Sequence, residues 1–247
     1  MRYVLAVQRT DSIYTCVVYK RRINDEFLLE RDEKKHLEIY YASFEYVNEE
    51  AKVVIVGITP GFHQMKKSFS TVIDAAERRH NDEEILRQAK NNSSFEGPMC
   101  KNLVKMLNDQ ELNEHLDLSS SSGLFKKAIH FVHTTSELAY SVFCNGKNCS
   151  ESTPSLLKNE MLKNYITGNF AAELINLSES LIIPLGVTVS NALNYLVKKE
   201  IVSSEQILSG FPHPSGGNGH RHKQFADNKR AMKDMLKVHF AKMEVSD

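Results

Sequence analysis

The sequence contains no long apolar run. None of its apolar stretches approaches the roughly 20 residues that a membrane-spanning helix needs. Residues 1–8 are too short and too weakly flanked to act as a secretory signal. We therefore expect a cytoplasmic protein that has no membrane partner.

Cysteine is scarce, and the cysteines are not paired at short spacing. Cys16, Cys100, Cys144 and Cys149 form no C-x-x-C motif, which is the spacing typical of zinc and iron–sulfur sites. This pattern does not indicate a disulfide framework either. We expect buried free thiols, no bound metal and no cofactor.

The sequence also lacks an excess of either charge. Lysine and arginine number 31, and aspartate and glutamate also number 31. The whole molecule therefore lacks the strong positive field of proteins that coat DNA non-specifically, and any nucleic-acid surface must be local. Residues 220–229 contain a basic cluster, although a charge run alone is more typical of a solvated helix start.

What the sequence does contain is an alternation of strand-like and helix-like segments, and its 247 residues fit a single domain. Apolar stretches predict strands at 52–58, 128–133, 181–185 and 207–211. Amphipathic stretches predict helices at 70–89, 99–107 and 188–199. This order predicts an α/β fold in which helices cover a parallel sheet. Residues 1–50 read as a strand-like addition to that sheet.

A first candidate loop directly follows the strand predicted at 52–58. It reads Gly-Ile-Thr-Pro-Gly, from Gly57 to Gly61. Ligands of open α/β sheets collect beyond the carboxyl ends of strands, so this turn is well placed for a site. The glycines permit close approach of a ligand, and Pro60 fixes the turn. Taken alone, the pattern equally fits a structural turn that Thr59 caps.

A second loop follows the strand predicted at 207–211. Residues 210–221 read Gly-Phe-Pro-His-Pro-Ser-Gly-Gly-Asn-Gly-His-Arg. Pro214 stiffens the chain directly after His213, and the glycines bring backbone N–H groups toward an anion such as a DNA phosphate. By itself this loop indicates phosphate binding.

Together, the two loops resemble the signature loops of the uracil-DNA glycosylase superfamily, Gly-x-x-Pro-Gly near the start and His-Pro-Ser near the end. Residues 131–134, followed by 145–148 and Pro154, resemble the base-reading strand and following loop of its single-strand-selective monofunctional branch. Residues 183–186 resemble the third core strand. Four matching segments in the same order, over roughly residues 52–237, argue against chance agreement.

The resemblance implies a fold as well as a function. The fold is a three-layer sandwich with a four-stranded parallel central sheet flanked by helices. It would form one glycosylase domain over residues 1–247, with an N-terminal addition at 1–50 and the superfamily core at 51–240.

The resemblance also assigns roles to single residues. His213 matches the histidine that hydrogen-bonds the leaving base, a role in which preorganised electrostatics supply much of the rate. No lysine nucleophile is indicated, which implies monofunctional hydrolysis by a monomer whose partner is DNA. The residues expected to hold the DNA phosphates are Ser215, Gly216, Gly217 and Asn218. His220 or Arg221 is expected to enter the space that the flipped base vacates.

Two positions depart from the superfamily pattern. Thr59 stands where relatives place Asp, Asn or Glu to orient the attacking water, and its hydroxyl can hold a water but cannot act as a general base at neutral pH. Thr134, or its neighbour His133, stands where uracil-specific relatives place an asparagine that reads the base. Both departures indicate poor uracil excision and a pocket built for another base.

Further base contacts come from apolar residues. Phe95 resembles the aromatic residue that stacks on the extruded base, an interaction worth about 1–3 kcal/mol per base. Phe62 and Phe69 compete with it for this role, and each of the three can instead pack the core. Ile58, in the first loop, is a further candidate for contact with the base.

We therefore expect a monofunctional DNA glycosylase that excises a modified pyrimidine. The pattern around residues 133–143 resembles bacterial glycosylases that attack glucosylated hydroxymethylcytosine in phage DNA, which implies antiviral defence. Two alternatives stay open. One is ordinary uracil repair in which Thr59 holds the water, and the other is an inactive DNA-binding relative.

Overall fold

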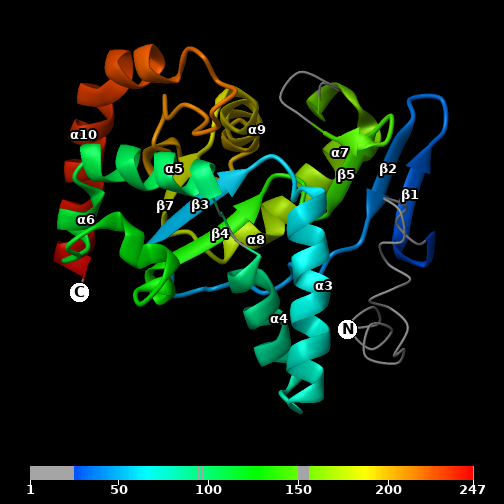
Figure 1. The fold of residues 1–247 in the computed structure, drawn as a ribbon. Helices are drawn as coiled ribbons and strands as arrows, with labels where there is room; N and C mark the ends of the chain where they lie inside the picture. The colour runs from blue at the N-terminus through cyan, green and yellow to red at the C-terminus, as the bar shows by residue number, and fades with distance from the viewer. Residues whose placement is uncertain (1–24, 94, 96, 150–155, 247) are drawn as a thin grey trace. The chain divides into compact units, whose positions relative to one another are not determined.

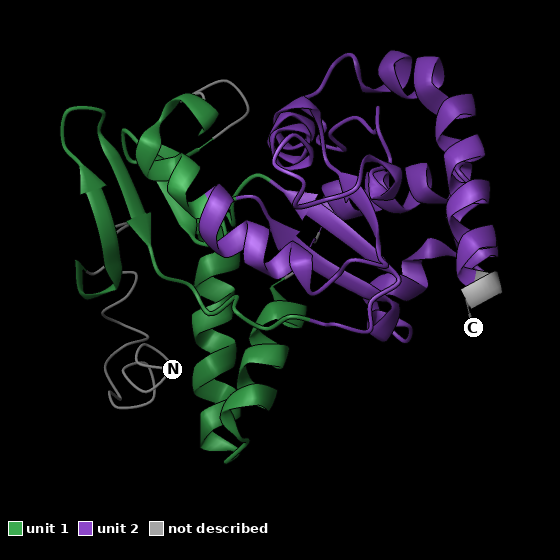
Figure 2. Ribbon diagram, turned by 180° about the vertical axis from the view of Figure 1, so that it is seen from behind, with its two compact units in different colours: residues 1–47, 58–94, 138–165 green, residues 48–57, 95–137, 166–247 purple. Residues whose placement is uncertain are grey.

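A computed structural model describes residues 25–93, 95, 97–149 and 156–246. The chain divides into two compact units, each assembled from separate stretches of sequence (Figure 2). Unit 1 comprises residues 1–47, 58–94 and 138–165. Unit 2 comprises residues 48–57, 95–137 and 166–247. A single domain over residues 1–247 stays a prediction.

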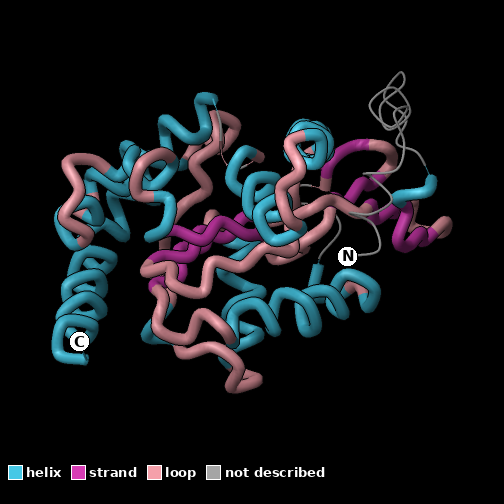
Figure 3. Tube along the Cα trace, turned by 90° about the horizontal axis from the view of Figure 1, so that it is seen from below, coloured by secondary structure: helices cyan, strands magenta, loops and turns pink. Residues whose placement is uncertain are grey.

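Unit 2 is built on a parallel sheet of three strands, β3 (Val53–Gly57), β4 (Val132–Ser136) and β7 (Leu181–Pro184), with β3 in the centre (Figure 1). The strands run side by side in Figure 3. Residues 53–56 of β3 are fully buried, as expected for an apolar central strand whose two faces are both covered. The expectation of an α/β fold is confirmed.

The helices of unit 2 follow these strands in chain order. They are α5 (Gly97–Asp109), α6 (Leu112–His115), α8 (Ala171–Ile175), α9 (Val187–Val197) and α10 (Arg221–Ser246). Shorter 3₁₀ turns lie at η2 (Ser121–Phe125), η3 (Ile129–Phe131) and η6 (Ser204–Gln206), and a π turn lies at η5 (Ile166–Phe170).

Helices cover both faces of the parallel sheet. Neighbouring residues of a strand point to opposite faces, and on one face Val53 and Ile55 share an apolar core with residues of α5 and α10. On the other face, His133 and Thr135 of β4 contact Glu173 of α8. The sheet is therefore the middle layer of unit 2.

The fourth predicted strand, at 207–211, is a single bridge in the described part of the chain. Ile207 pairs in parallel with Ile182 of β7, and the Leu208 N–H donates to the Ile182 oxygen at 2.8 Å. Gly210 then adopts a φ of +86°, and Pro212 has no N–H to donate. The chain therefore leaves the sheet after one bridge, and the described sheet has three strands where four were predicted.

Two other predicted boundaries are wrong. The strand predicted at 128–133 begins only at Val132, because the preceding residues form η3. The helix predicted at 70–89 is two helices, α3 (Phe62–Glu77) and α4 (Asp82–Asn92). Arg79 has a φ of +60°, which ends the first helix. Asn81 caps the second helix by accepting the N–H of Glu84 at 2.9 Å.

Unit 1 contains a separate antiparallel sheet in the order β1-β2-β5-β6. Its strands are β1 (Leu28–Asp32), β2 (Leu37–Tyr40), β5 (Ser141–Cys144) and β6 (Lys147–Asn148), and the unit also contains η1 (Asp25–Phe27), η4 (Leu156–Lys158) and α7 (Glu160–Tyr165). The addition expected at 1–50 therefore contributes two strands to this second sheet instead of extending the parallel one. Its first part, residues 1–24, lies outside the described residues.

An Asn-Gly turn joins β5 to β6. Asn145 and Gly146 have φ values of +52° and +69°, the left-handed geometry of a two-residue hairpin turn. The segment 145–148, which resembles the loop that follows the base-reading strand, is thus a tight hairpin. Pro154, part of the same resemblance, lies outside the described residues.

The apolar face of α3 forms the core of unit 1. Met65, Phe69 and Val72 of this helix pack with Tyr40 and Phe143 from the antiparallel sheet. Phe69, a competitor for the base-stacking role, is 2% exposed within this core. It is therefore a packing residue.

Cys100, Cys144 and Cys149 form no disulfide, and only Cys149 is fully buried. Cys16 lies outside the described residues. Among the helices of the described residues, none combines the length and the apolar character that crossing a membrane requires.

Truncation of the central strand tests the packing of unit 2. Ile55 is fully buried, whereas Ile175, at the end of α8, is 58% exposed. We expect Ile55→Ala to lower the free energy of unfolding by about 2–5 kcal/mol, because it leaves a cavity. Ile175→Ala should change it by less than about 0.5 kcal/mol. Urea unfolding of both variants measures the difference, and equal losses would contradict the assigned core.

Candidate functional site

The carboxyl edge of the parallel sheet gathers four segments of unit 2. The Glu137 N–H, directly after β4, donates to the oxygen of Gly57 at the end of β3, at 2.9 Å. The Gly186 N–H, after β7, donates to the Phe211 oxygen at 3.2 Å. The start of the 210–221 loop therefore lies at the same edge as the strand ends, where ligands of α/β sheets bind.

His213 follows Phe211 in this loop and is half-buried. The Ser215 N–H donates to its Nδ1 atom at 3.2 Å. A neutral imidazole that accepts at Nδ1 carries its proton on Nε2. The loop thus favours the tautomer that donates from Nε2, the form that a base oxygen would require.

Two side chains outside the signature hold the loop backbone. Asn102 of α5 donates from Nδ2 to the Pro214 oxygen at 2.9 Å. Arg221 donates from Nη1 to the oxygens of Pro214 and Ser215, at 3.1 and 2.7 Å. The Arg221 guanidinium therefore turns back onto its own loop, which favours the exposed His220 for the space of a flipped base.

Asn218 and Ser215 fix the loop from within. Asn218 donates from Nδ2 to the His213 oxygen at 3.3 Å, and its own N–H donates to the Ser215 oxygen at 3.2 Å. The Gly217 N–H donates to Ser215 Oγ at 3.1 Å. Both predicted phosphate-holding side chains are therefore used to shape the backbone.

The packing around the glycines of this loop differs from one glycine to another. At Gly210, a Cβ would lie 2.7 Å from the Asn228 side chain, so the packing requires glycine. At Gly216 and Gly219, no described atom lies within 4 Å of a Cβ, and at Gly217 only Ser215 makes ordinary contact. These three glycines keep negative or extended φ. Their bare backbone would permit close approach from outside, as binding of a phosphate would need.

The first loop is divided between the units after Gly57. In unit 1, Thr59 donates from Oγ1 to the Tyr140 oxygen at 2.8 Å and accepts the Val142 N–H at 3.1 Å. Its single hydroxyl proton is thus bound to the backbone beside β5. A water could only donate to Thr59, so the geometry favours a structural role over the predicted water-holding one.

The other predicted residues of the first loop also pack within unit 1. Ile58 is 9% exposed, and Phe62 stacks edge-on against Phe143 with ring centroids 6.4 Å apart. A Cβ at Gly61 would lie 3.0 Å from Asn148 Nδ2, which explains the glycine by packing.

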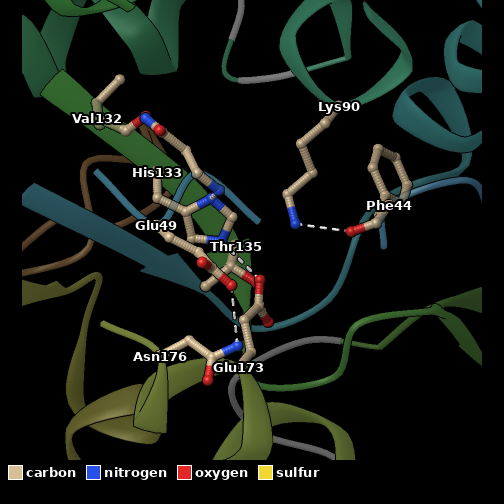
Figure 4. Close-up of polar contacts among 9 residues, drawn as sticks. Phe44, Glu49, Lys90, Val132, His133, Thr135, Glu173 and Asn176 are labelled. Atoms are coloured by element: carbon tan, nitrogen blue, oxygen red, sulfur yellow. Dashed lines mark hydrogen bonds and ion pairs between the residues drawn. The ribbon is translucent and has the colours of Figure 1, made fainter. Parts of the chain in front are cut away.

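His133 is a satisfied core histidine. It is 2% exposed, and its Nε2 lies 2.6 Å from Glu173 Oε1 (Figure 4). Its Nδ1 accepts the Asn48 N–H at 3.3 Å, and Thr135 donates to the same glutamate at 2.9 Å. Both ring nitrogens are engaged, which leaves Thr134, half-buried on the opposite face of β4, as the predicted base reader.

Phe95 lies beside the end of β3. A Cβ at Gly57 would be 4.0 Å from Phe95 Cζ and 3.6 Å from Ser136 Oγ. The Phe95 ring is half-buried and meets Phe125 edge-on, with centroids 6.4 Å apart. An aromatic ring thus stands at the site edge within unit 2, as the stacking role would require.

Glu137 is the residue that the motifs missed. Its side chain is 0% exposed, and neither carboxylate oxygen has a hydrogen-bond partner among the described residues. Burial raises its pKa to about 8. A glutamate is almost never fully buried without a partner, and such a group at a sheet edge marks a functional candidate. The available signal was its position directly after a strand.

No group of three or more His, Cys, Asp or Glu side chains that could hold a metal ion is found among the described residues.

Comparison with known proteins finds a relative. The chain is 35% identical over 217 residues to "Uncharacterized protein YoxB" of Bacillus subtilis (strain 168), covering 87% of this chain and 84% of that protein. No protein-family model matches the chain, and no solved structure matches it significantly.

Glycine-to-alanine variants separate the two kinds of glycine in the second loop. Gly210→Ala should destabilise the protein by more than about 1 kcal/mol, because of its positive φ and the clash with Asn228. Gly216→Ala should change stability by less than about 0.5 kcal/mol, yet weaken binding of a short oligonucleotide. Thermal unfolding and fluorescence anisotropy measure the two effects. Unchanged binding by Gly216→Ala would remove the phosphate role.

The raised pKa of Glu137 predicts an unusual pH dependence of stability. In the folded protein the Glu137 carboxyl stays protonated up to about pH 8. In the unfolded chain it loses its proton near its ordinary pKa of 4.5. Raising the pH between these values therefore favours unfolding, by up to about 5 kcal/mol. Glu137→Gln removes this cost, so its advantage over the wild type should grow from pH 5 to pH 8. Urea unfolding at both pH values tests this, and a constant difference would contradict the shift.

Proposed function

We propose that this chain, which belongs to the family of the Bacillus subtilis protein YoxB, is a monofunctional DNA glycosylase that excises a modified pyrimidine. One observation carries the proposal. The Ser215 N–H donates to His213 Nδ1, which favours the tautomer that donates from Nε2, in a bare glycine loop that begins at the carboxyl edge of a parallel sheet. The two motifs that resemble the uracil-DNA glycosylase superfamily supply the context.

We also infer that unit 2 corresponds to the core of that superfamily. Its three parallel strands lie between helices, and the bridge at Ile207 stands where a fourth strand would lie. The order of the candidate residues along the sheet edge, with the glycine loop before a long helix, supports this correspondence.

The chemistry follows from the positions of these groups. The target nucleotide must leave the base stack before its glycosidic bond can be reached. The Nε2–H of His213 then donates to an oxygen of the departing base, where negative charge develops. Water adds to the sugar carbon as the bond to the base breaks, and the products are a free base and an abasic site.

The DNA backbone would lie on the glycine loop. The loop leads directly into α10, which is 26 residues long, and the first residues of α10 include Arg221, His222 and Lys223. Exposed N–H groups and the positive end of a helix dipole both favour an anion at this point. Such a local site suits a chain without a net charge.

The choice of a modified pyrimidine rests on Thr134. A threonine offers one short hydroxyl where an asparagine would read both the carbonyl and the ring N–H of uracil. A side chain shorter than that of asparagine would permit a base that carries a substituent. Glucosylated hydroxymethylcytosine in phage DNA is the substrate that we propose, with defence against phages as the setting.

The direct test is base release from phage DNA. Purified protein is incubated with genomic DNA that carries plain cytosine, hydroxymethylcytosine or its glucosylated form, and abasic sites are counted. We expect abasic sites on modified DNA and a loss of at least about 100-fold in the His213→Ala variant. The matched control is His130→Ala, an exposed histidine in η3, before the amino end of β4.

Each result of this test has one meaning. Background counts on every modified DNA would overturn the proposed substrate. Abasic sites on a uracil-containing oligonucleotide alone would favour ordinary uracil repair. DNA binding without base release on any substrate would identify an inactive relative.

A further inference from the structure

We propose that the carboxyl group of Glu137 is the proton donor to the base that leaves. The inference rests on the proposed function and adds a catalytic residue to it. It also narrows the substrate to cytosine-type bases, whose departure needs a proton more than that of uracil.

Glu137 is the first residue after β4, and its N–H continues the ladder to Gly57 at 2.9 Å. It therefore stands at the carboxyl edge of the sheet, the edge that also holds the Phe211–His213 segment through Gly186. β4 and β7 flank β3, so the ends of β4 and β7 are separated by two strand spacings, about 10 Å, along this edge.

Both oxygens of Glu137 are buried, and neither has a partner among the described residues. A buried polar group that lacks a hydrogen-bond partner typically costs about 1–3 kcal/mol of folding free energy. Proteins pair nearly all buried polar groups, and the exceptions point to a role for the missing partner. A base with its own donors and acceptors is such a partner.

Burial alone raises the pKa of Glu137 to about 8, with no contribution from any charged side chain. On the same strand, His133 is paired with Glu173 and adds nothing to this pKa. Glu137 is therefore a neutral acid at pH 7, able to donate a proton and unable to act as a base.

No other group described at the two loops fills this role. The Thr59 proton is donated to the Tyr140 oxygen. His213, whose Nδ1 accepts the Ser215 N–H, would donate a hydrogen bond from Nε2 to a base oxygen and keep its proton in that role. Glu137 is the buried acid at this edge.

The step balances in protons and electrons. The bond between the sugar C1′ and the base N1 breaks, and its electron pair passes into the base ring. The Glu137 proton moves to the ring nitrogen N3, so the cytosine-type base leaves as a neutral molecule. Water bonds to C1′ and releases one proton to solvent, and a solvent proton restores the Glu137 carboxyl. Uracil, which can leave as a stabilised anion, gains less from this proton.

The test is single-turnover base release at several pH values by the wild type, Glu137→Gln and Glu205→Gln. The substrate is an oligonucleotide carrying glucosylated hydroxymethylcytosine. Glu205 is an exposed glutamate paired with Lys242, so its variant is the control. We expect the wild-type rate to be level below pH 8 and to fall tenfold per pH unit above it. Glu137→Gln should be slower by about 10²–10⁴-fold and level throughout, and Glu205→Gln should match the wild type.

Two results would overturn the proposal in distinguishable ways. If Glu137→Gln matches the rate and the pH profile of the wild type, Glu137 is not the donor, and the glycosylase function stands. If the wild type releases no base from any DNA, the proposed function fails and the role of Glu137 fails with it. Thermal unfolding separates a catalytic loss from a folding defect, because glutamine at this position should not lower stability at pH 7 or above.

Discussion

The site depends on the register of one buried strand. β3 pairs in parallel with β4 on one side and β7 on the other, and Val53 is opposite both Val132 and Leu181. This alignment makes the three strands end together. The segments that follow them therefore meet at one edge of unit 2, although they are far apart in sequence. The apolar residues that bury β3 have no chemical role, yet they determine where the polar residues stand.

The second loop combines a fixed frame with an open surface. Asn102 and Arg221 satisfy the carbonyl oxygens around Pro214, and Asn218 closes the loop from within. Side-chain hydrogen bonds thus hold the backbone of the loop. At Gly216 and Gly217, no described side chain covers this backbone. A rigid frame lowers the entropy lost when a ligand binds. This arrangement suits the recognition of a phosphate backbone, which offers charge and shape but little else.

The sequence predicted the parts that depend on local pattern, namely the buried strand at 52–58, the helices at 99–107 and 188–199, and the two loops. It could not predict that Thr59 gives its proton to Tyr140, or that His133 is paired with Glu173, because these contacts join distant segments. The strand predicted at 207–211 is reduced to one bridge because of Gly210 and Pro212. Both residues are local signals in the sequence, but the apolar residues around them favoured a strand. Glu137 escaped notice because only burial makes its carboxyl unusual.

Hydrogen exchange tests whether DNA binds at the carboxyl edge of the unit 2 sheet, as we propose. The protein is bound to an oligonucleotide that carries a stable abasic-site analogue, and amide exchange is compared with that of the free protein. We expect slower exchange at residues 57, 95, 137 and 211–221, with little change in the second half of α10. Protection confined to other surfaces, with no change at this edge, would contradict it.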